Sequence, residues 1–226
     1  MPSSPRRQIV IALFDRFTAL DAVGPHQVLH HLPGTDVVFA SERAGGVTDE
    51  SGTLTLQATA AYADVPGPDI LVVPGGPGQA AQMTPGPLRD WILAADQTST
   101  WTTSVCTGSL ILAAAGLLRG RAATTYWLAL EELRGLGAVP RQERFVFDGK
   151  YATAAGVSAG IDLALALAGR IAGDAEARRI QLAIEYDPHP PYQSGSPATA
   201  DPELVRRFAR GSRFAPRQSG QAAVEM

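Results

Sequence analysis

Cys106 is the only cysteine of this chain, and it stands where an apolar segment, residues 101–105, is followed by a helical pattern. At such a corner a thiol meets free backbone N–H groups and the positive end of the helix dipole, and both favour the thiolate. Gly108 removes a side chain where the backbone passes close by, as in the nucleophile elbow of serine enzymes. This placement indicates an activated nucleophile, and the alternative is a lone buried cysteine that serves as a small hydrophobic residue.

Two other segments carry groups that complete a site for attack on an electrophilic carbon. Asp21 follows the first predicted strand and offers a carboxyl group as proton donor or acceptor. Gly75 and Gly76 follow another strand, where backbone N–H groups can stabilise a developing negative charge. Each residue also has a plainer structural interpretation: Asp21 as a helix N-cap, the Thr107 hydroxyl as another cap, and the glycines as a turn.

These segments belong to an alternation of strand and helix patterns. Apolar runs predict strands at residues 8–14, 36–41, 69–73, 101–105 and 122–125. Helical spacing predicts helices at 21–32, 87–97, directly after Cys106, and at 127–134, 158–172, 174–186 and 201–210, with Asp174 as an N-cap. Hairpins are predicted at 45–58, with a turn near 50–52, and at 144–154, with a turn at 148–149. The pattern predicts an α/β fold, in which helices cover both sides of a mostly parallel sheet and ligands bind outside the carboxyl ends of its strands.

Composition limits the class of protein. With 226 residues, 45% hydrophobic and 18% charged, the chain can bury one sizeable core. We expect a flexible N-terminus over residues 1–7, a single domain over 8–210 and a disordered tail over 211–226. A net charge of −3 gives no electrostatic reason to expect nucleic acid or a membrane as a partner. One cysteine cannot form an intramolecular disulfide, and neither a signal peptide nor a membrane span fits, so we expect a soluble, cytoplasmic protein.

Three motifs of the chain resemble those of the ThiJ/PfpI superfamily. They are SVCTGS at residues 104–109, PGG at 74–76 and ATT at 123–125. Within this superfamily, the isocyanide (isonitrile) hydratase branch resembles the chain in an ordered set of motifs over about residues 9–201. The additional motifs are LD at 20–21, GPH at 24–26, GID at 160–162, QL at 181–182, EY at 185–186, PP at 190–191 and GSP at 195–197.

The resemblance implies a flavodoxin-like three-layer αβα sandwich and an enzyme that needs no metal or organic cofactor. Such an enzyme adds water to an isocyanide and releases an N-substituted formamide. The resemblance makes Cys106 the nucleophile, which forms a thioimidate, and Asp21 the acid and base. A carboxyl group beside a thiolate in a dry cleft is expected to have a raised pKa. Thr107 and Gly76 would contribute backbone N–H groups, and a homodimer is implied.

The chain departs from this pattern at two places. It has Tyr126 before Trp127, where the pattern has histidine, so a phenol replaces an imidazole. It also has Ala154-Ala155-Gly156 where a glycine triplet is usual, and the added methyl groups narrow or stiffen the cleft. The substrate pocket is therefore expected to include a set of five residues: Gly75, Tyr126, Trp127, Ala155 and Gly156.

Two alternatives to the hydratase remain open at this point. One is another thiol enzyme of the superfamily, with glyoxalase-like, deglycase-like or amidase-like activity on a small electrophile. Protease-like and amidase-like relatives usually have histidine after the cysteine, whereas this chain has Thr107. The other alternative is a redox-sensing thiol protein without enzymatic activity. We expect no metal site, because no carboxylate or cysteine joins the histidines at ligand spacing.

Overall fold

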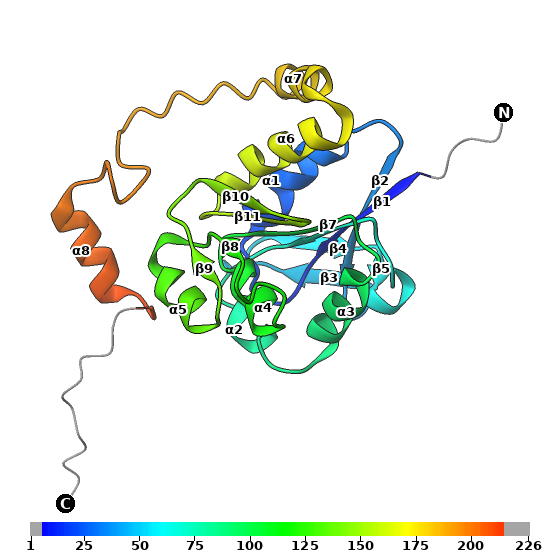
Figure 1. Ribbon diagram of the computed structural model, residues 1–226, viewed down its shortest axis with the longest axis horizontal. Helices are drawn as coiled ribbons and strands as arrows, with labels where there is room; N and C mark the ends of the chain where they lie inside the picture. Colours follow the sequence, from blue (N-terminus) through cyan, green and yellow to red (C-terminus); the bar gives the residue numbers. More distant parts are fainter. Residues whose placement is uncertain (1–5, 215–226) are drawn as a thin grey trace, which may run out of the picture. The chain divides into compact units, whose positions relative to one another are not determined.

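The computed structural model describes residues 6–214, and at its centre is a seven-stranded sheet (Figure 1). Its strands are β1 (Arg7–Ala12), β2 (Thr35–Ser41), β5 (Ala60–Ala61), β6 (Ile70–Val73), β7 (Trp101–Val105), β10 (Phe145–Asp148) and β11 (Tyr151–Ala154). They are arranged in the order β10-β11-β7-β6-β1-β2-β5, and only the pairing of β10 with β11 is antiparallel. The mostly parallel sheet predicted from the sequence is therefore confirmed.

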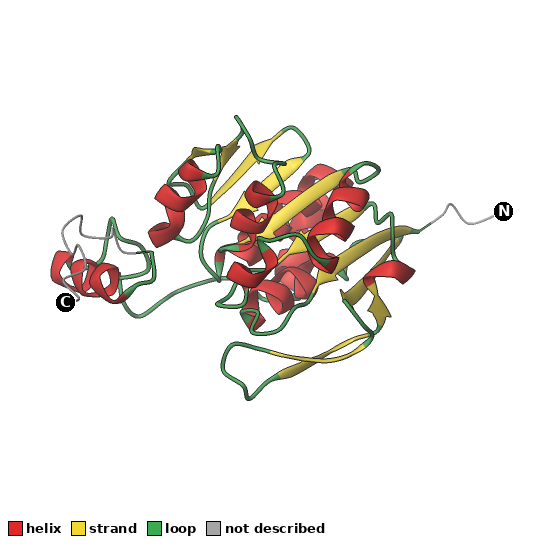
Figure 2. Ribbon diagram, turned by 90° about the horizontal axis from the view of Figure 1, so that it is seen from below, coloured by secondary structure: helices red, strands yellow, loops and turns green. Residues whose placement is uncertain are grey.

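Helices cover both faces of this sheet. Figure 1 shows α1 (Ala19–Leu29), α6 (Ala159–Ala172) and α7 (Asp174–Ala183) on one side of the strands. On the other side are α2 (Gln79–Gln82), α3 (Pro87–Asp96), α4 (Gly108–Ala114) and α5 (Leu130–Gly135). From a second direction, Figure 2 shows the strands enclosed between helices. The covering explains why β1 and β6 are apolar runs, because side chains on both faces of these strands are buried.

Two small sheets lie outside the central one. The first is the hairpin of β3 (Gly45–Thr48) and β4 (Thr55–Ala58), which confirms the hairpin predicted at 45–58. The second pairs β8 (Ala122–Ala123) with β9 (Val139–Pro140), so the strand predicted at 122–125 is shorter and stays out of the main sheet. Two 3₁₀ turns complete these regions, η1 (Tyr62–Asp64) and η2 (Trp127–Ala129).

Glycine allows α1 and α6 to approach each other and the end of β7. A Cβ on Gly160 would lie 3.0 Å from a Val105 methyl and 3.3 Å from Pro25 Cγ. A Cβ on Gly24 would lie 3.1 Å from Ile161 Cγ1. A larger residue at either position would push the two helices apart, together with the segments that they carry to the site.

The chain divides into two compact units, Met1–Asp187 and Pro188–Met226. The boundary lies where the sequence becomes rich in Pro, Ser and Gly, and it divides the region 8–210 that was expected to form one domain. In the second unit, α8 (Pro202–Gly211) begins after Asp201, whose carboxylate accepts hydrogen bonds from the Glu203 and Leu204 N–H groups at 2.7 and 3.2 Å.

Both predicted terminal segments fall largely outside the described residues. Residues 1–5 and 215–226 lie outside, whereas Arg7 already belongs to β1. The predicted N-cap at Asp174 is wrong by one position, because Gly173, with φ +89°, precedes the first residue of α7. Over residues 6–214, no helix is both long and apolar enough to cross a membrane.

Candidate active site

The order of the strands brings together the three segments that carry Asp21, the glycine pair and Cys106. β1, β6 and β7 are adjacent, and all three segments follow the carboxyl ends of these strands. The Gly75 N–H donates a hydrogen bond to Asp21 Oδ2 at 2.8 Å, and the Gly76 N–H donates to Thr107 Oγ1 at 3.0 Å. The predicted convergence of these segments is therefore present in the structure.

Cys106 is located at a sharp corner between β7 and α4. Its φ is +55°, a left-handed conformation that costs a residue with a side chain about 1–3 kcal/mol. Hydrogen bonds to both the N–H and the carbonyl of Cys106 hold the corner. The Cys106 N–H donates to the Ala154 and Ala155 carbonyls at 3.1 and 3.0 Å, while the Cys106 carbonyl accepts from the Thr125 and Ser109 hydroxyls at 3.0 and 3.2 Å. These contacts keep the corner in a conformation that the residue would otherwise avoid.

Glycine is required immediately after the corner and opposite it. A Cβ on Gly108 would lie 2.1 Å from the Val73 carbonyl oxygen, closer than two such atoms can approach. A Cβ on Gly75 would lie 2.5 Å from the Thr107 nitrogen. Both glycines therefore allow the loop after β6 to pack directly against the first turn of α4.

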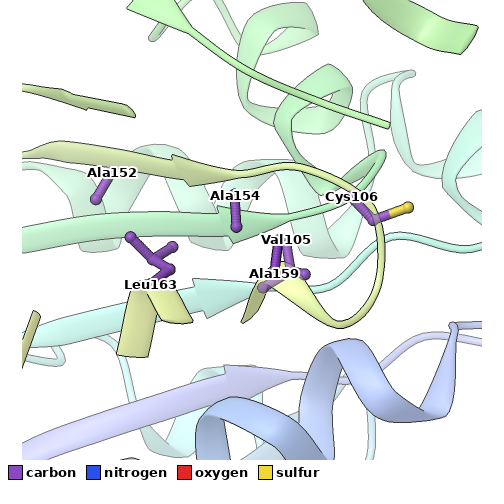
Figure 3. Close-up of a cluster of buried hydrophobic side chains, with 6 residues drawn as sticks. All are labelled: Val105, Cys106, Ala152, Ala154, Ala159 and Leu163. Carbon is purple, nitrogen blue, oxygen red and sulfur yellow. The ribbon is translucent and has the colours of Figure 1, made fainter. Parts of the chain in front are cut away.

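Cys106 belongs to a buried hydrophobic cluster, and its sulfur points away from the other members (Figure 3). The other members are Val105, Ala152, Ala154, Ala159 and Leu163. The side chain is only 6% exposed. Burial and the charge of Asp21 raise the pKa of the Cys106 thiol far above its usual value, although hydrogen bonds from the Val157 and Thr107 backbones lower it. Desolvation therefore opposes the backbone groups that favour the thiolate at this corner, and the activated nucleophile expected from the sequence stays a prediction.

Asp21 is fully buried in the first turn of α1. It is not the N-cap, because that position belongs to Thr18, so the plainer interpretation of Asp21 fails. Oδ2 accepts the bond from Gly75, while Oδ1 is buried and has no hydrogen-bond partner among the described residues. Burial raises the pKa of Asp21 to about 7, and a smaller effect of the Glu50 charge acts in the same direction. As expected, this carboxyl group can carry a proton near neutral pH.

Thr107 and Gly76 are joined by a hydrogen bond. The Thr107 side chain makes no capping hydrogen bond to α4, and its hydroxyl instead accepts the Gly76 N–H. The Gly76 N–H therefore donates to a neighbouring hydroxyl in the structure, and its role as a donor to the sulfur or to a developing negative charge stays a prediction. The Thr107 backbone does hydrogen bond to the Cys106 side chain.

Val157 is a site residue that sequence reasoning missed. Its backbone hydrogen bonds to the Cys106 side chain, and its φ is +40°. A β-branched residue rarely adopts this conformation, so no local signal marks Val157 as a donor. Its position depends on the loop between β11 and α6, which only the assembled fold brings to the sulfur.

The remaining predicted pocket residues surround the same corner. A Cβ on Gly156 would lie 3.0 Å from Tyr126 Cδ2, so the absence of a side chain there accommodates the Tyr126 ring. The Tyr126 ring packs against the apolar cluster that includes Cys106, and burial and the charge of Cys106 raise the pKa of Tyr126. Trp127 packs edge-to-face against it, with ring centroids 5.9 Å apart. Ala155 contributes its carbonyl to the corner and packs against the apolar cluster that includes Cys106.

A large cavity and the histidines lie apart from the residues around Cys106. A cavity of about 560 Å³ is lined by residues such as Asp15, Arg43 and Tyr62, and neither Asp21 nor Cys106 contributes to its wall. His26 and His30 stack at 5.2 Å between ring centroids. Within residues 6–214, no group of three or more metal-binding side chains is placed to hold an ion.

Together these features define a flavodoxin-like α/β protein with a buried cysteine at a strand-to-helix elbow. The chain belongs to the DJ-1/PfpI family, whose model matches residues 7–170. It is 42% identical over 198 residues to the isonitrile hydratase of Pseudomonas putida, covering 88% of this chain and 86% of that protein.

Solved structures agree with this assignment. A THiJ/PfpI family protein from Pseudomonas syringae matches with a TM-score of 0.87 and 32% identity, over 95% of this chain and 92% of that one. Drosophila melanogaster DJ-1beta matches with a TM-score of 0.72 over 80% of this chain and 98% of that one, and at 18% identity it supports the fold alone. The resemblance inferred from the motifs is confirmed at the level of the family.

Proposed function

We propose that the protein is a cofactor-independent isocyanide hydratase that converts an isocyanide and water to an N-substituted formamide. The observation that carries this proposal is the 42% identity, over 88% of the chain, to a protein named isonitrile hydratase. The buried pair of Asp21 and Cys106 supports it, because the reaction needs a nucleophile and a group that moves protons.

The first half of the proposed reaction forms a bond between Cys106 Sγ and the terminal carbon of the isocyanide. Ionised Asp21 removes the thiol proton as the sulfur attacks. The carboxyl group then delivers this proton to the same carbon, which gives the thioimidate R–N=CH–S and leaves Asp21 ionised. Since Gly75 engages Oδ2, the unpartnered Oδ1 is the oxygen assigned to this transfer.

The second half consumes water and restores the enzyme. Water adds to the thioimidate carbon, and the nitrogen gains a proton. The carbon–sulfur bond then breaks, the sulfur regains a proton, and the formamide R–NH–CHO is released. Together the two halves convert one isocyanide and one water molecule to one formamide, and no oxidant or reductant is consumed. The backbones of Thr107 and Val157 hold the sulfur in place as its charge changes.

The group attached to the isocyanide nitrogen is assigned to the side of the site formed by Gly75, Tyr126, Trp127, Ala155 and Gly156. The edge-to-face pair of Tyr126 and Trp127 offers apolar ring surface next to the sulfur. This surface favours a hydrophobic substituent. The resemblance also leads us to propose that the protein is a homodimer and that it is located in the cytoplasm. Light scattering of the purified protein measures its oligomeric state.

The decisive experiment incubates the reduced, purified protein with an aryl isocyanide and measures formamide by mass spectrometry. We expect formamide from the wild type and none above the uncatalysed rate from Cys106→Ala. Glu132→Gln is the control, because it removes an exposed charge on α5 and should leave formamide production at the wild-type level. Absence of formamide from folded, reduced wild type, with lactate formed from methylglyoxal instead, would assign the site to another activity of the superfamily.

A further inference from the structure

The hairpin formed by β3 and β4 reaches the loop that leads into α1. The Arg16 N–H donates to the Thr48 carbonyl at 3.0 Å, and the Glu50 N–H donates to the Phe17 carbonyl at 2.9 Å. Asp49 and Phe17 form a parallel β-bridge between these two hydrogen bonds. The tip of the hairpin is therefore attached to the segment that ends four residues before Asp21.

The tip itself has a defined conformation. Asp49 is only 7% exposed, and its Oδ1 accepts hydrogen bonds from the Ser51 N–H, the Ser51 hydroxyl and the Leu54 N–H at 3.2, 2.7 and 3.3 Å. These bonds close the turn around Glu50. The backbone of Glu50 is thus fixed both by this turn and by Phe17, although its side chain is exposed.

We propose that Glu50 is a positioning residue of the Cys106 site, carried on a hairpin tip that is bonded to the loop leading to Asp21. This inference rests on the proposed function, because it assigns Glu50 a part in controlling the protons that the hydration uses. Glu50 makes no bond to the reacting atoms and acts on the pair of Asp21 and Cys106 through its charge.

The charges around the pair support this role. The negative charge of Glu50 raises the pKa of both Asp21 and Cys106. Asp21 itself acts in the same direction on Cys106, and Tyr126, in the segment before η2, packs against the cluster that includes Cys106. The nearest residue of opposite charge along the docked loop is Arg16, which is exposed. The charge of Glu50 disfavours loss of a proton from the pair of Asp21 and Cys106. The pair therefore keeps a proton to donate at neutral and mildly basic pH.

The alkylation rate of Cys106 tests this proposal without any measurement of hydration. Cys106 is the only cysteine, so iodoacetamide labelling of thiols reports on this residue alone. In Glu50→Gln at pH 8 and low salt, we expect alkylation about two- to tenfold faster than in the wild type, because one repelling charge is removed. Glu132→Gln, which removes an exposed charge on α5, should match the wild type.

Salt and a conservative variant separate the charge effect from a loosened hairpin. Because Glu50 is exposed, the difference between Glu50→Gln and the wild type should shrink at 1 M salt, where charges are screened within about 3 Å. Glu50→Asp should restore most of the slow alkylation. An equal rate in wild type and Glu50→Gln at low salt would overturn the proposal, as would a faster rate that persists unchanged at 1 M salt. Either result leaves the formamide assay of the wild type as an independent test of the proposed function.

Discussion

At the scale of single residues, Asp21 and Cys106 form a pair in which burial raises the pKa of both groups. The thiol is not activated by the helix end alone, because it loses more solvation than the corner N–H groups return. In the proposed mechanism, the proton of Cys106 therefore moves as the sulfur attacks. Asp21, with a pKa of about 7, is the group positioned to take that proton and return it.

Asp21→Asn separates the acid from the thiol. Asn can still accept the Gly75 hydrogen bond, but it cannot transfer a proton, so we expect formamide turnover to fall by about a hundredfold to ten-thousandfold. The same variant should alkylate faster at pH 8, because the charge that raises the pKa of Cys106 is gone. Steady-state kinetics and iodoacetamide labelling measure the two effects. Turnover close to the wild-type value would remove Asp21 from the mechanism.

Sequence reasoning could name Cys106, Asp21 and Thr107, because each stands next to a recognisable strand end or helix start. It could not name Val157 or Glu50. Val157 contributes a backbone group in a conformation unusual for its type, and Glu50 acts from a hairpin tip whose position depends on contacts with Phe17. The Gly76 N–H donates to the neighbouring Thr107 hydroxyl, and the sequence gives no sign of this partner.

At the scale of elements, the site depends on how closely the loop after β6 approaches the start of α4. The predicted strands β1, β6 and β7 were correct, and in β1 and β6 a buried apolar run is a clear signal. The strand predicted at 122–125 is reduced to the two residues of β8, and so short a strand carries no information about which sheet it joins. The position of the thiol is therefore set by close backbone packing, which single glycines permit.

Gly108→Ala tests this packing. The added Cβ would lie 2.1 Å from the Val73 carbonyl, so the elbow must shift, and we expect a loss of about 1–3 kcal/mol in the free energy of unfolding. Gly135→Ala is the matched control, since a Cβ there meets nothing within 4 Å, and it should be neutral or slightly stabilising. Urea denaturation measures both variants. Equal stability of the two would contradict the tight contact between the β6 loop and α4.

At the scale of the whole molecule, the buried carboxyl group of Asp21 makes stability depend on pH. Its pKa is about 7 in the folded protein, against an ordinary value of 3.8 for an exposed aspartate. Between these values the unfolded chain releases a proton that the folded protein keeps. Folding therefore loses stability as pH rises from about 4 to about 7, and the full cost is present above 7.

Asp21→Asn should remove this dependence. Above pH 7 the variant is expected to be more stable than the wild type by about 4 kcal/mol at most, which is the cost of a shift of this size in one buried group. Near pH 4 the two proteins should be equally stable. Urea unfolding at pH 4.5 and pH 8 measures the difference, and a gap that is the same at both values would mean that Asp21 is not the group responsible.

The measurement that tests the central claim most directly is rapid-quench mass spectrometry of the protein during turnover of an aryl isocyanide. We expect the peptide containing Cys106 to gain the mass of one isocyanide, this adduct to decay as formamide appears, and Cys106→Ala to form neither. Formamide produced by Cys106→Ala at the wild-type rate, with no adduct on the wild-type peptide, would contradict covalent hydration at this site.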